Sequence, residues 1–119
     1  MKTTIKILIV SALCCFIFGI NNSYSQAAEK KTETFIVYGN CDMCKDNIEG
    51  VLKKKEGVLK KDWSTKTKML TVTYDPAKTT LTQIKQKIAD AGYDTDEIRA
   101  KDAVYNNLHK CCQYERAKK

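Results

Sequence analysis

Two cysteines stand three positions apart in the stretch YGNCDMCKDNIEGVL, and their spacing is one that supports chemistry. Cys41 and Cys44 (the loop pair) follow a short apolar run and come directly before a helical pattern. Thiols at this spacing can hold a soft metal ion, exchange disulfides with a substrate, or form a structural disulfide. A bridge that closes a loop of two residues adds little stability, so metal binding and redox chemistry are the stronger interpretations.

The expected position of the loop pair at the start of a helix favours ionised thiols. Unpaired backbone N–H groups and the positive end of the helix dipole lower the pKa of a thiol there, and Lys45 adds a positive charge nearby. Thiolates of this kind select soft ions. We therefore expect the loop pair to bind Cu(I), with Hg(II) or Zn(II) as alternatives. Met43 lies between the two cysteines, and its thioether either approaches Cu(I), packs against the domain or points to solvent.

The redox alternative is a small thiol–disulfide oxidoreductase, because Cys-x-x-Cys is also the signature of thioredoxin-like enzymes. Those folds are longer and place a cis-proline beside the active site. The one proline of this chain, Pro76, stands in an Asp-Pro turn before the second predicted helix. The sequence also contains no Ser/His/Asp set, no carboxylate pair in a cleft pattern and no phosphate-binding loop, so we do not expect an enzyme.

A second group of candidate ligands lies near the C-terminus. Cys111 and Cys112 (the tail pair) are adjacent, and His109 stands two residues before them. Residues 103–108 have a short helical spacing that could dock this tail on the domain. A five-residue strand leads the chain about 17 Å away from the metal edge, and a two-turn helix with a few extended residues could return it about as far. We expect a three- or four-sulfur site with the loop pair, the alternative being a loose tail whose thiols form disulfides.

The elements that must position these residues follow from apolar spacing. Apolar residues three and four positions apart predict the helices, the second of them with a capping box at Thr80 and Gln83. Alternation of apolar and polar residues predicts the strands. The expected strands are residues 34–38, 58–64 and 69–74 with a short one near 95–99, and the expected helices run from Cys44 to a stop at Gly57 and from 81 to 91 with Gly92 after it.

This order of elements predicts the fold class. Two helices on one face of an antiparallel four-stranded sheet give an α+β sandwich of the ferredoxin-like βαββαβ type, with a C-terminal extension. The domain is expected over residues 34–100, after a polar leader at 26–33, and the cysteine-containing tail over 101–119. Tyr93 follows the second helix at the edge of the sheet where the loop pair lies, and it either shields the site or packs in the core.

Residues 1–25 have the pattern of a secretory signal peptide. Lys2 and Lys6 precede an apolar run over residues 7–20, and small residues at 23–25 suit cleavage. The run is shorter than the about 20 residues that span a bilayer. We expect an exported, periplasmic protein in which only the loop pair and the tail pair remain as cysteines. The formal net charge of +7 comes from dispersed lysines without interleaved aromatic residues, so we expect no nucleic-acid partner.

Residues 34–93 resemble the heavy-metal-associated domain family. The motifs that carry the resemblance are TFIVYG, CDMC, EGVLKKDW, KMLTVTYDP and IADAGYD. The family includes small copper chaperones, metal-binding modules of copper-pumping ATPases and periplasmic mercury-binding proteins. The resemblance implies a protein that sequesters or delivers a soft metal ion, with a metal-transporting membrane protein or another metal-binding domain as partner. The chain departs from the family pattern Gly-Met-x-Cys-x-x-Cys, because Gly39 and Asn40 directly precede the first cysteine, and it departs again in its tail.

Overall fold

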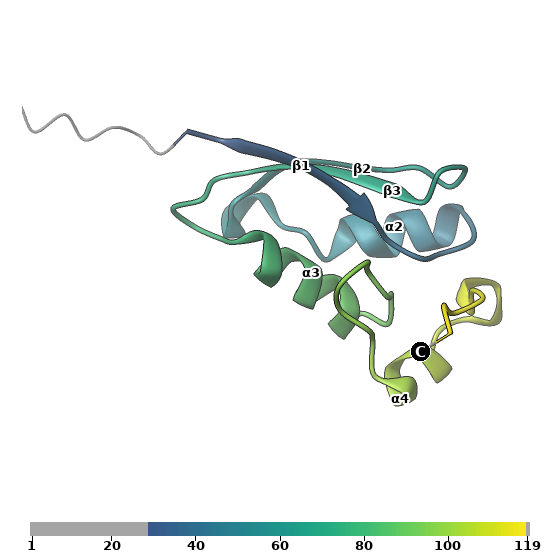
Figure 1. Ribbon diagram of the computed structural model, residues 1–119. Helices are drawn as coiled ribbons and strands as arrows, with labels where there is room; N and C mark the ends of the chain where they lie inside the picture. Colours follow the sequence, from purple (N-terminus) through teal and green to yellow (C-terminus); the bar gives the residue numbers. More distant parts are fainter. Residues whose placement is uncertain (1–28, 119) are drawn as a thin grey trace, which may run out of the picture.

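The computed structural model describes residues 29–118 and contains a three-stranded antiparallel sheet (Figure 1). The strands β1 (Lys31–Ile36), β2 (Val58–Trp63) and β3 (Met69–Tyr74) are ordered β1-β3-β2. The helices α2 (Asp42–Gly50) and α3 (Leu81–Asp90) cover one face of the sheet. This is the predicted ferredoxin-like α+β arrangement. The predicted signal peptide lies outside the described residues, and so does the start of the predicted leader.

Strand β1 begins earlier than the apolar pattern predicted, because the exposed residues of its first half also pair with β3. Lys31 pairs with Tyr74 at the far end of the ladder. The hydroxyl of Thr32 lies 2.8 Å from that of Thr73 on β3, and a second threonine pair two residues along repeats the contact. The first four residues of β1 are exposed, so the last residues of the predicted leader belong to the sheet without any apolar signature.

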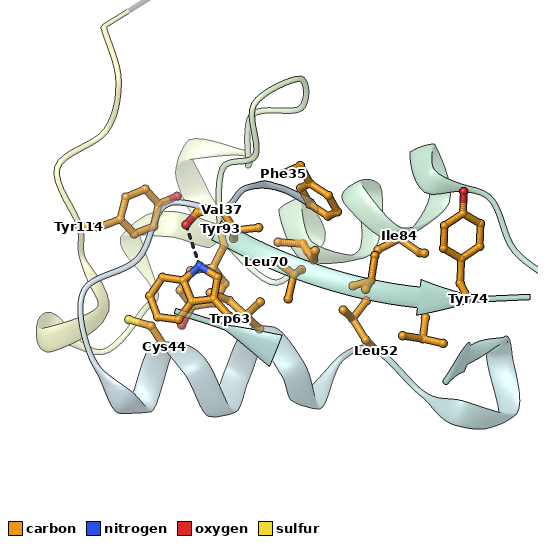
Figure 2. Packing of buried hydrophobic residues seen from close by; sticks show 14 of the residues in the cluster. Phe35, Val37, Cys44, Leu52, Trp63, Leu70, Tyr74, Ile84, Tyr93 and Tyr114 are labelled. Atoms are coloured by element: carbon orange, nitrogen blue, oxygen red, sulfur yellow. Dashed lines mark hydrogen bonds between the residues drawn. The ribbon is translucent and has the colours of Figure 1, made fainter. Parts of the chain in front are cut away.

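The core fills the space between the sheet and the two helices. Trp63 is buried at the end of β2, and its indole N–H donates to the carbonyl of Val37 at 2.9 Å (Figure 2). Each large apolar side chain buried in this way contributes about 1.5–3 kcal/mol. The fully buried apolar side chains of this layer, from the two helices, the central strand and the segment after α2, include Ile48, Leu52, Leu70, Val72, Ile84 and Ile88.

The first helix is shorter than predicted. It ends at Gly50, and a separate 3-10 turn (Lys54–Glu56) leads to Gly57, which has the left-handed φ of 104°. The α-helix ends here because Leu52 N–H donates to the carbonyl of Glu49, three residues back. The carbonyl of Leu52 in turn accepts a hydrogen bond from the Lys61 ammonium at 2.5 Å. The capping box at the start of α3 is confirmed.

The prediction of a short fourth strand near residues 95–99 is wrong. One isolated bridge joins Thr95 to Val37 beside the end of β1. The chain then turns back on itself, because Thr95 N–H donates to the carbonyl of Ile98 at 2.8 Å and the Thr95 hydroxyl accepts from Ile98 N–H at 2.9 Å. A threonine that bonds its own neighbours in this way competes with a β ladder.

The tail packs onto the domain through α4 (Asp102–Asn106) and the 3-10 turn η2 (Lys110–Cys112). Tyr105 and Leu108 lie against the core, as the helical spacing predicted, whereas Ala103 is exposed. Gly92 has a φ of 104°, and a Cβ there would lie 3.0 Å from a methyl carbon of Leu108. The glycine therefore both ends the second helix and leaves room for the tail.

A buried tyrosine fixes the end of the tail. Tyr114 stacks on Tyr93, with ring centroids 6.0 Å apart, and meets the edge of Tyr105 at 5.1 Å. Its hydroxyl donates to the carbonyl of Gly92 at 2.9 Å and accepts from Asp94 N–H at 2.8 Å. Figure 2 shows this ring on the tail beside Tyr93. The tail is thus part of the core. In the part of the chain that the structure describes, no helix is both long and apolar enough to cross a membrane.

Candidate metal centre

The loop before α2 is held close to the core by a glycine. A Cβ at Gly39 would lie 3.0 Å from the ring of Trp63 and 3.2 Å from Cβ of Cys44. A larger residue would therefore push the loop off the indole. Two residues after Gly39 comes Cys41, which is the N-cap residue of α2 and has extended backbone angles.

The loop pair lies at the helix start, as predicted. The two sulfur atoms are 3.7 Å apart, with Cys44 fully buried and Cys41 half-buried. The backbone N–H of Asn40 donates to Cys44 Sγ at 3.4 Å. Backbone N–H groups, chiefly that of Cys44, lower the pKa of the Cys41 thiol. The first turn of α2 thus favours a thiolate at Cys41, as expected at a helix N-terminus.

Lys45 is not oriented toward the sulfur atoms. Its ammonium lies 2.8 Å from Asp62, 2.9 Å from Glu49 and 2.6 Å from the carbonyl of Trp63. The hydrogen bond with Asp62 is the main cause that raises the pKa of Lys45. The side chain therefore ties α2 to strand β2, and the positive charge expected beside the loop pair is already paired with carboxylates.

The tail brings its own cysteines to the loop. Sγ atoms of Cys41, Cys111 and Cys112 all lie within 4.8 Å of one another, and the tail pair itself is 4.0 Å apart. The carbonyl of Cys111 accepts from Asn40 Nδ2 at 3.4 Å and from the Cys41 thiol at 3.6 Å. The structure thus places the tail pair beside the loop pair, with all four cysteines as free thiols. Their role as metal ligands stays a prediction.

The two members of the tail pair have different environments. Cys111 is exposed, whereas Cys112 is fully buried. Burial raises the pKa of the Cys112 thiol to about 12, against a smaller lowering by Tyr93 and a further rise from Cys44. A metal ion that takes this sulfur must displace its proton, so the affinity of such a site depends on pH.

Tyr93 packs in the core, which is one of the two roles that its position suggested, and its role as a shield of the site stays a prediction. It is fully buried in the core, and its hydroxyl accepts from Asn47 Nδ2 of α2 at 2.9 Å. The same phenol acts on the Cys112 thiol, whose pKa it lowers. The phenol therefore lies in the core beside the buried sulfur of Cys112.

Two further soft ligands lie on the outer side of the cluster. The exposed Met43 has its thioether sulfur 3.7 Å from Cys111 Sγ. The ring nitrogen Nδ1 of His109 lies 3.9 Å from the same sulfur. Cys111 thus stands between the buried sulfurs and a thioether and an imidazole at the surface.

The sulfur spacing suits a soft ion. With metal–sulfur bonds of about 2.3 Å, two ligands are about 3.8 Å apart at a tetrahedral centre and about 4.0 Å apart at a trigonal one. The observed separations of 3.7 Å in the loop pair and 4.0 Å in the tail pair match these values. Little rearrangement is needed to bring either pair to one ion.

Three residues that support this geometry gave no signal in the sequence. Asn40 binds the tail carbonyl, Tyr114 holds the tail in the core, and Arg116 pairs with the buried Asp94. Each contact joins residues far apart in the chain, and none follows a periodic pattern. Only Asn40 could have been singled out from the sequence, because it stands directly before the first cysteine, where the chain departs from the family pattern Gly-Met-x-Cys-x-x-Cys.

Known proteins resemble this chain over the domain. The sequence pattern described as "Heavy-metal-associated domain" matches residues 34–94. The copper chaperone CopZ of Staphylococcus saprophyticus is 41% identical over 64 residues, which are 53% of this chain and 94% of the chaperone. A zinc-transporting ATPase of Synechocystis is 38% identical over 87 residues, or 72% of this chain, and the chain spans 12% of that protein's length.

Solved structures agree with this relationship. The crystal structure of oxidized MerP from Ralstonia metallidurans superposes with a TM-score of 0.53 at 35% identity, over 57% of this chain and 96% of MerP. The tail with Cys111 and Cys112 lies beyond the residues that the family pattern matches. The fold, the loop pair at the start of α2 and the match over residues 34–94 together show that the chain belongs to the heavy-metal-associated domain family.

Proposed function

We propose that this protein is an exported carrier that sequesters or delivers a soft metal ion, and that this ion is Cu(I). The ligands are the loop pair, Cys41 and Cys44, together with the tail pair, Cys111 and Cys112. The observation that carries the proposal is the convergence of sulfurs from the two ends of the domain, three of them within 4.8 Å of one another and the fourth 3.7 Å from Cys41.

The ligand chemistry supports Cu(I) ahead of Zn(II). Thiolates select all three ions, but a thioether is a ligand for Cu(I) and is not among the usual ligands of zinc sites. Met43 places such a sulfur 3.7 Å from Cys111. The names of the relatives include copper, zinc and mercury proteins, so all three ions belong in the test.

Export and the choice of partner rest on the sequence and the relatives. The signal-peptide pattern of residues 1–25 supports a periplasmic location. Domains of this family form part of metal-transporting ATPases, which supports a metal-transporting membrane protein, or another metal-binding domain, as the partner. The exposed side of the site, at Cys111, is where such a partner would meet the ion.

Redox activity is the second candidate function. A half-buried Cys41 with a lowered pKa, 3.7 Å from the buried Cys44, is an arrangement that thiol–disulfide exchange requires. Insulin reduction in metal-free buffer tests this function directly. Turnover there would favour the oxidoreductase, whereas stoichiometric metal uptake without turnover favours the carrier.

An anaerobic titration tests the main proposal. The reduced protein is titrated with Cu(I), Zn(II) and Hg(II) separately, and the intact complexes are counted by native mass spectrometry with a competing chelator present. We expect tight Cu(I) binding that is lost when Cys41 and Cys44 are both changed to serine. Full affinity in that double variant would overturn the assignment of the site.

A further inference from the structure

The outer side of the sulfur cluster carries three soft ligands that one ion could share. We propose that Met43, His109 and Cys111 form a second Cu(I) subsite, and that Cys111 Sγ bridges it to the inner ion held by the other cysteines. This inference rests on the proposed function, because it assigns a second ion to the same centre. The centre would then bind two Cu(I) ions in sequence.

The distances suit an ion at this position. Cys111 Sγ lies 3.7 Å from Met43 Sδ and 3.9 Å from His109 Nδ1. Two sulfurs on one trigonal ion are about 4.0 Å apart, and a sulfur and an imidazole nitrogen are about 3.6–3.8 Å apart, with bonds of about 2.3 and 2.0–2.1 Å. The separations of Cys111 Sγ from the thioether and from the imidazole are therefore already near those that a shared ion requires.

The local backbone holds these ligands in place. Met43 stands in the first turn of α2, one residue before the buried Cys44. His109 is the N-cap of η2, and its carbonyl accepts from Cys112 N–H at 2.7 Å. The carbonyl of Cys111 is bound by Asn40. Each ligand of the outer subsite is thus next to a residue that the core or the loop fixes.

Charge gives a reason for a second ion. Four thiolates around one Cu(I) leave three negative charges, part of them on buried sulfurs, and buried unpaired charge is costly. A second Cu(I) removes one of these charges, and its other two ligands, a thioether and an imidazole, are neutral. Filling the outer subsite therefore lowers the negative charge of the centre, because neither of the two added ligands is charged.

Exposure divides the roles of the two positions. Met43, His109 and Cys111 are exposed, whereas Cys44 and Cys112 are fully buried. An ion in the outer subsite lies where a partner's ligands can reach it without opening the domain. The inner ion would be retained, and the outer ion would be the one that exchanges.

A double variant separates the outer subsite from the thiols. Met43→Leu/His109→Gln keeps all four cysteines and changes only exposed side chains, so folding should be unaffected, which thermal unfolding checks. The matched control is Met69→Leu/Lys101→Gln, which removes a methionine of β3 and a charge at the start of α4 and retains Met43 and His109. Each purified, reduced protein is titrated anaerobically with Cu(I) against a chelator, and native mass spectrometry counts the ions.

We expect the wild type and the control to bind two ions and the double variant to bind one. The first affinity should stay within about threefold, and the second should fall at least about tenfold. His109 is the single histidine of the chain, so its ring signals in NMR report the outer subsite directly and should shift only with the second equivalent.

The outcomes distinguish the two proposals. Two ions in the double variant, or a histidine ring that does not respond to the second equivalent, would overturn the outer subsite. A wild type that binds one ion tightly and no more would also overturn it, while the proposed function stands. A wild type that binds none would overturn the proposed function itself.

Discussion

Arg116 donates two parallel hydrogen bonds to the buried carboxylate of Asp94, Nε to Oδ2 at 2.8 Å and Nη2 to Oδ1 at 2.7 Å. The same guanidinium lies 2.7 Å from Asp102 and donates to the carbonyl of Ala100 at 2.6 Å. Asp94 also accepts from Ala100 N–H at 2.7 Å. The pair therefore fastens the end of the tail to the segment after α3, on which the position of the tail pair depends.

Arg116→Ala should destabilise the fold by about 3 kcal/mol, because it leaves a buried carboxylate without its partner. Urea unfolding at pH 7 measures the loss. Arg116→Lys is the matched control, since it retains the charge but not the bidentate geometry, and we expect a smaller loss. Equal stability of wild type and alanine variant would show that the pair contributes nothing.

The effect of Arg116→Ala should depend on pH. Burial by itself raises the pKa of Asp94, but hydrogen bonds from Arg116 and Ala100 N–H hold it below the usual value. In the wild type the contribution of Asp94 is complete above the unfolded pKa of about 3.9 and is lost as the pH falls through the lower folded value. Without Arg116, fewer interactions oppose the effect of burial, so the pKa of Asp94 is higher in the alanine variant than in the wild type. The difference in unfolding free energy between the wild type and the variant should therefore narrow toward pH 3. Urea unfolding at several pH values checks this, and a constant gap would contradict it.

The sequence predicted the parts of the structure that follow local rules. Alternation marked strand β3, a capping box marked the start of α3, and Cys-x-x-Cys before an amphipathic pattern placed the loop pair at a helix start. Each of these features depends on residues within a few positions of one another. They were enough to give the fold class and half of the candidate site.

The remainder depends on contacts between distant residues. Strand β1 extends through exposed threonine pairs with β3, and Thr95 uses its hydroxyl to turn the chain where a strand was expected. The position of the tail pair was open because nothing local in the tail shows that Tyr114 binds Gly92 and stacks on Tyr93. Such tertiary contacts leave no periodic pattern, so the sequence could suggest that the tail reaches the loop but could not establish it.

Tyr114→Phe should weaken the attachment of the tail. The change retains the stacked ring but removes a hydroxyl that bonds Gly92 and Asp94, leaving two buried backbone groups unpaired at about 1–3 kcal/mol each before water enters. Tyr74→Phe is the control, since no hydrogen bond of the Tyr74 hydroxyl is found in the described structure. We expect the Tyr114 variant alone to lose stability in urea and to release Cu(I) to a chelator faster. Identical release rates would show that the tail does not retain the ion.

Oxidation should prevent metal binding. Cys41 and Cys44 have their sulfur atoms 3.7 Å apart, closer than the 4.0 Å of the tail pair, and Cys41 has the lowered pKa that makes a thiol reactive. Protein purified in air should therefore contain a disulfide between them and take up little metal until a reductant is added. Peptide mapping by mass spectrometry identifies the bridge. Full Cu(I) binding by the oxidised protein would show that these two sulfurs are not the ligands.

The last prediction separates the metals through the tail pair. Deleting the tail would also remove Tyr114 from the core, so Cys111→Ser/Cys112→Ser is the sharper change, with Cys41→Ser/Cys44→Ser as its counterpart. Zn(II) prefers four ligands at a tetrahedral centre, whereas two thiolates can satisfy Cu(I) or Hg(II). Loss of the tail pair should therefore weaken Zn(II) binding on the order of a hundredfold and the other two ions less, because water would replace two strong ligands. Competition titrations with each ion measure this. Unchanged affinities for all three would show that the loop pair works alone, and an equal loss for Cu(I) would indicate that copper depends on the tail pair as strongly as zinc does, an arrangement suited to storage more than to rapid transfer.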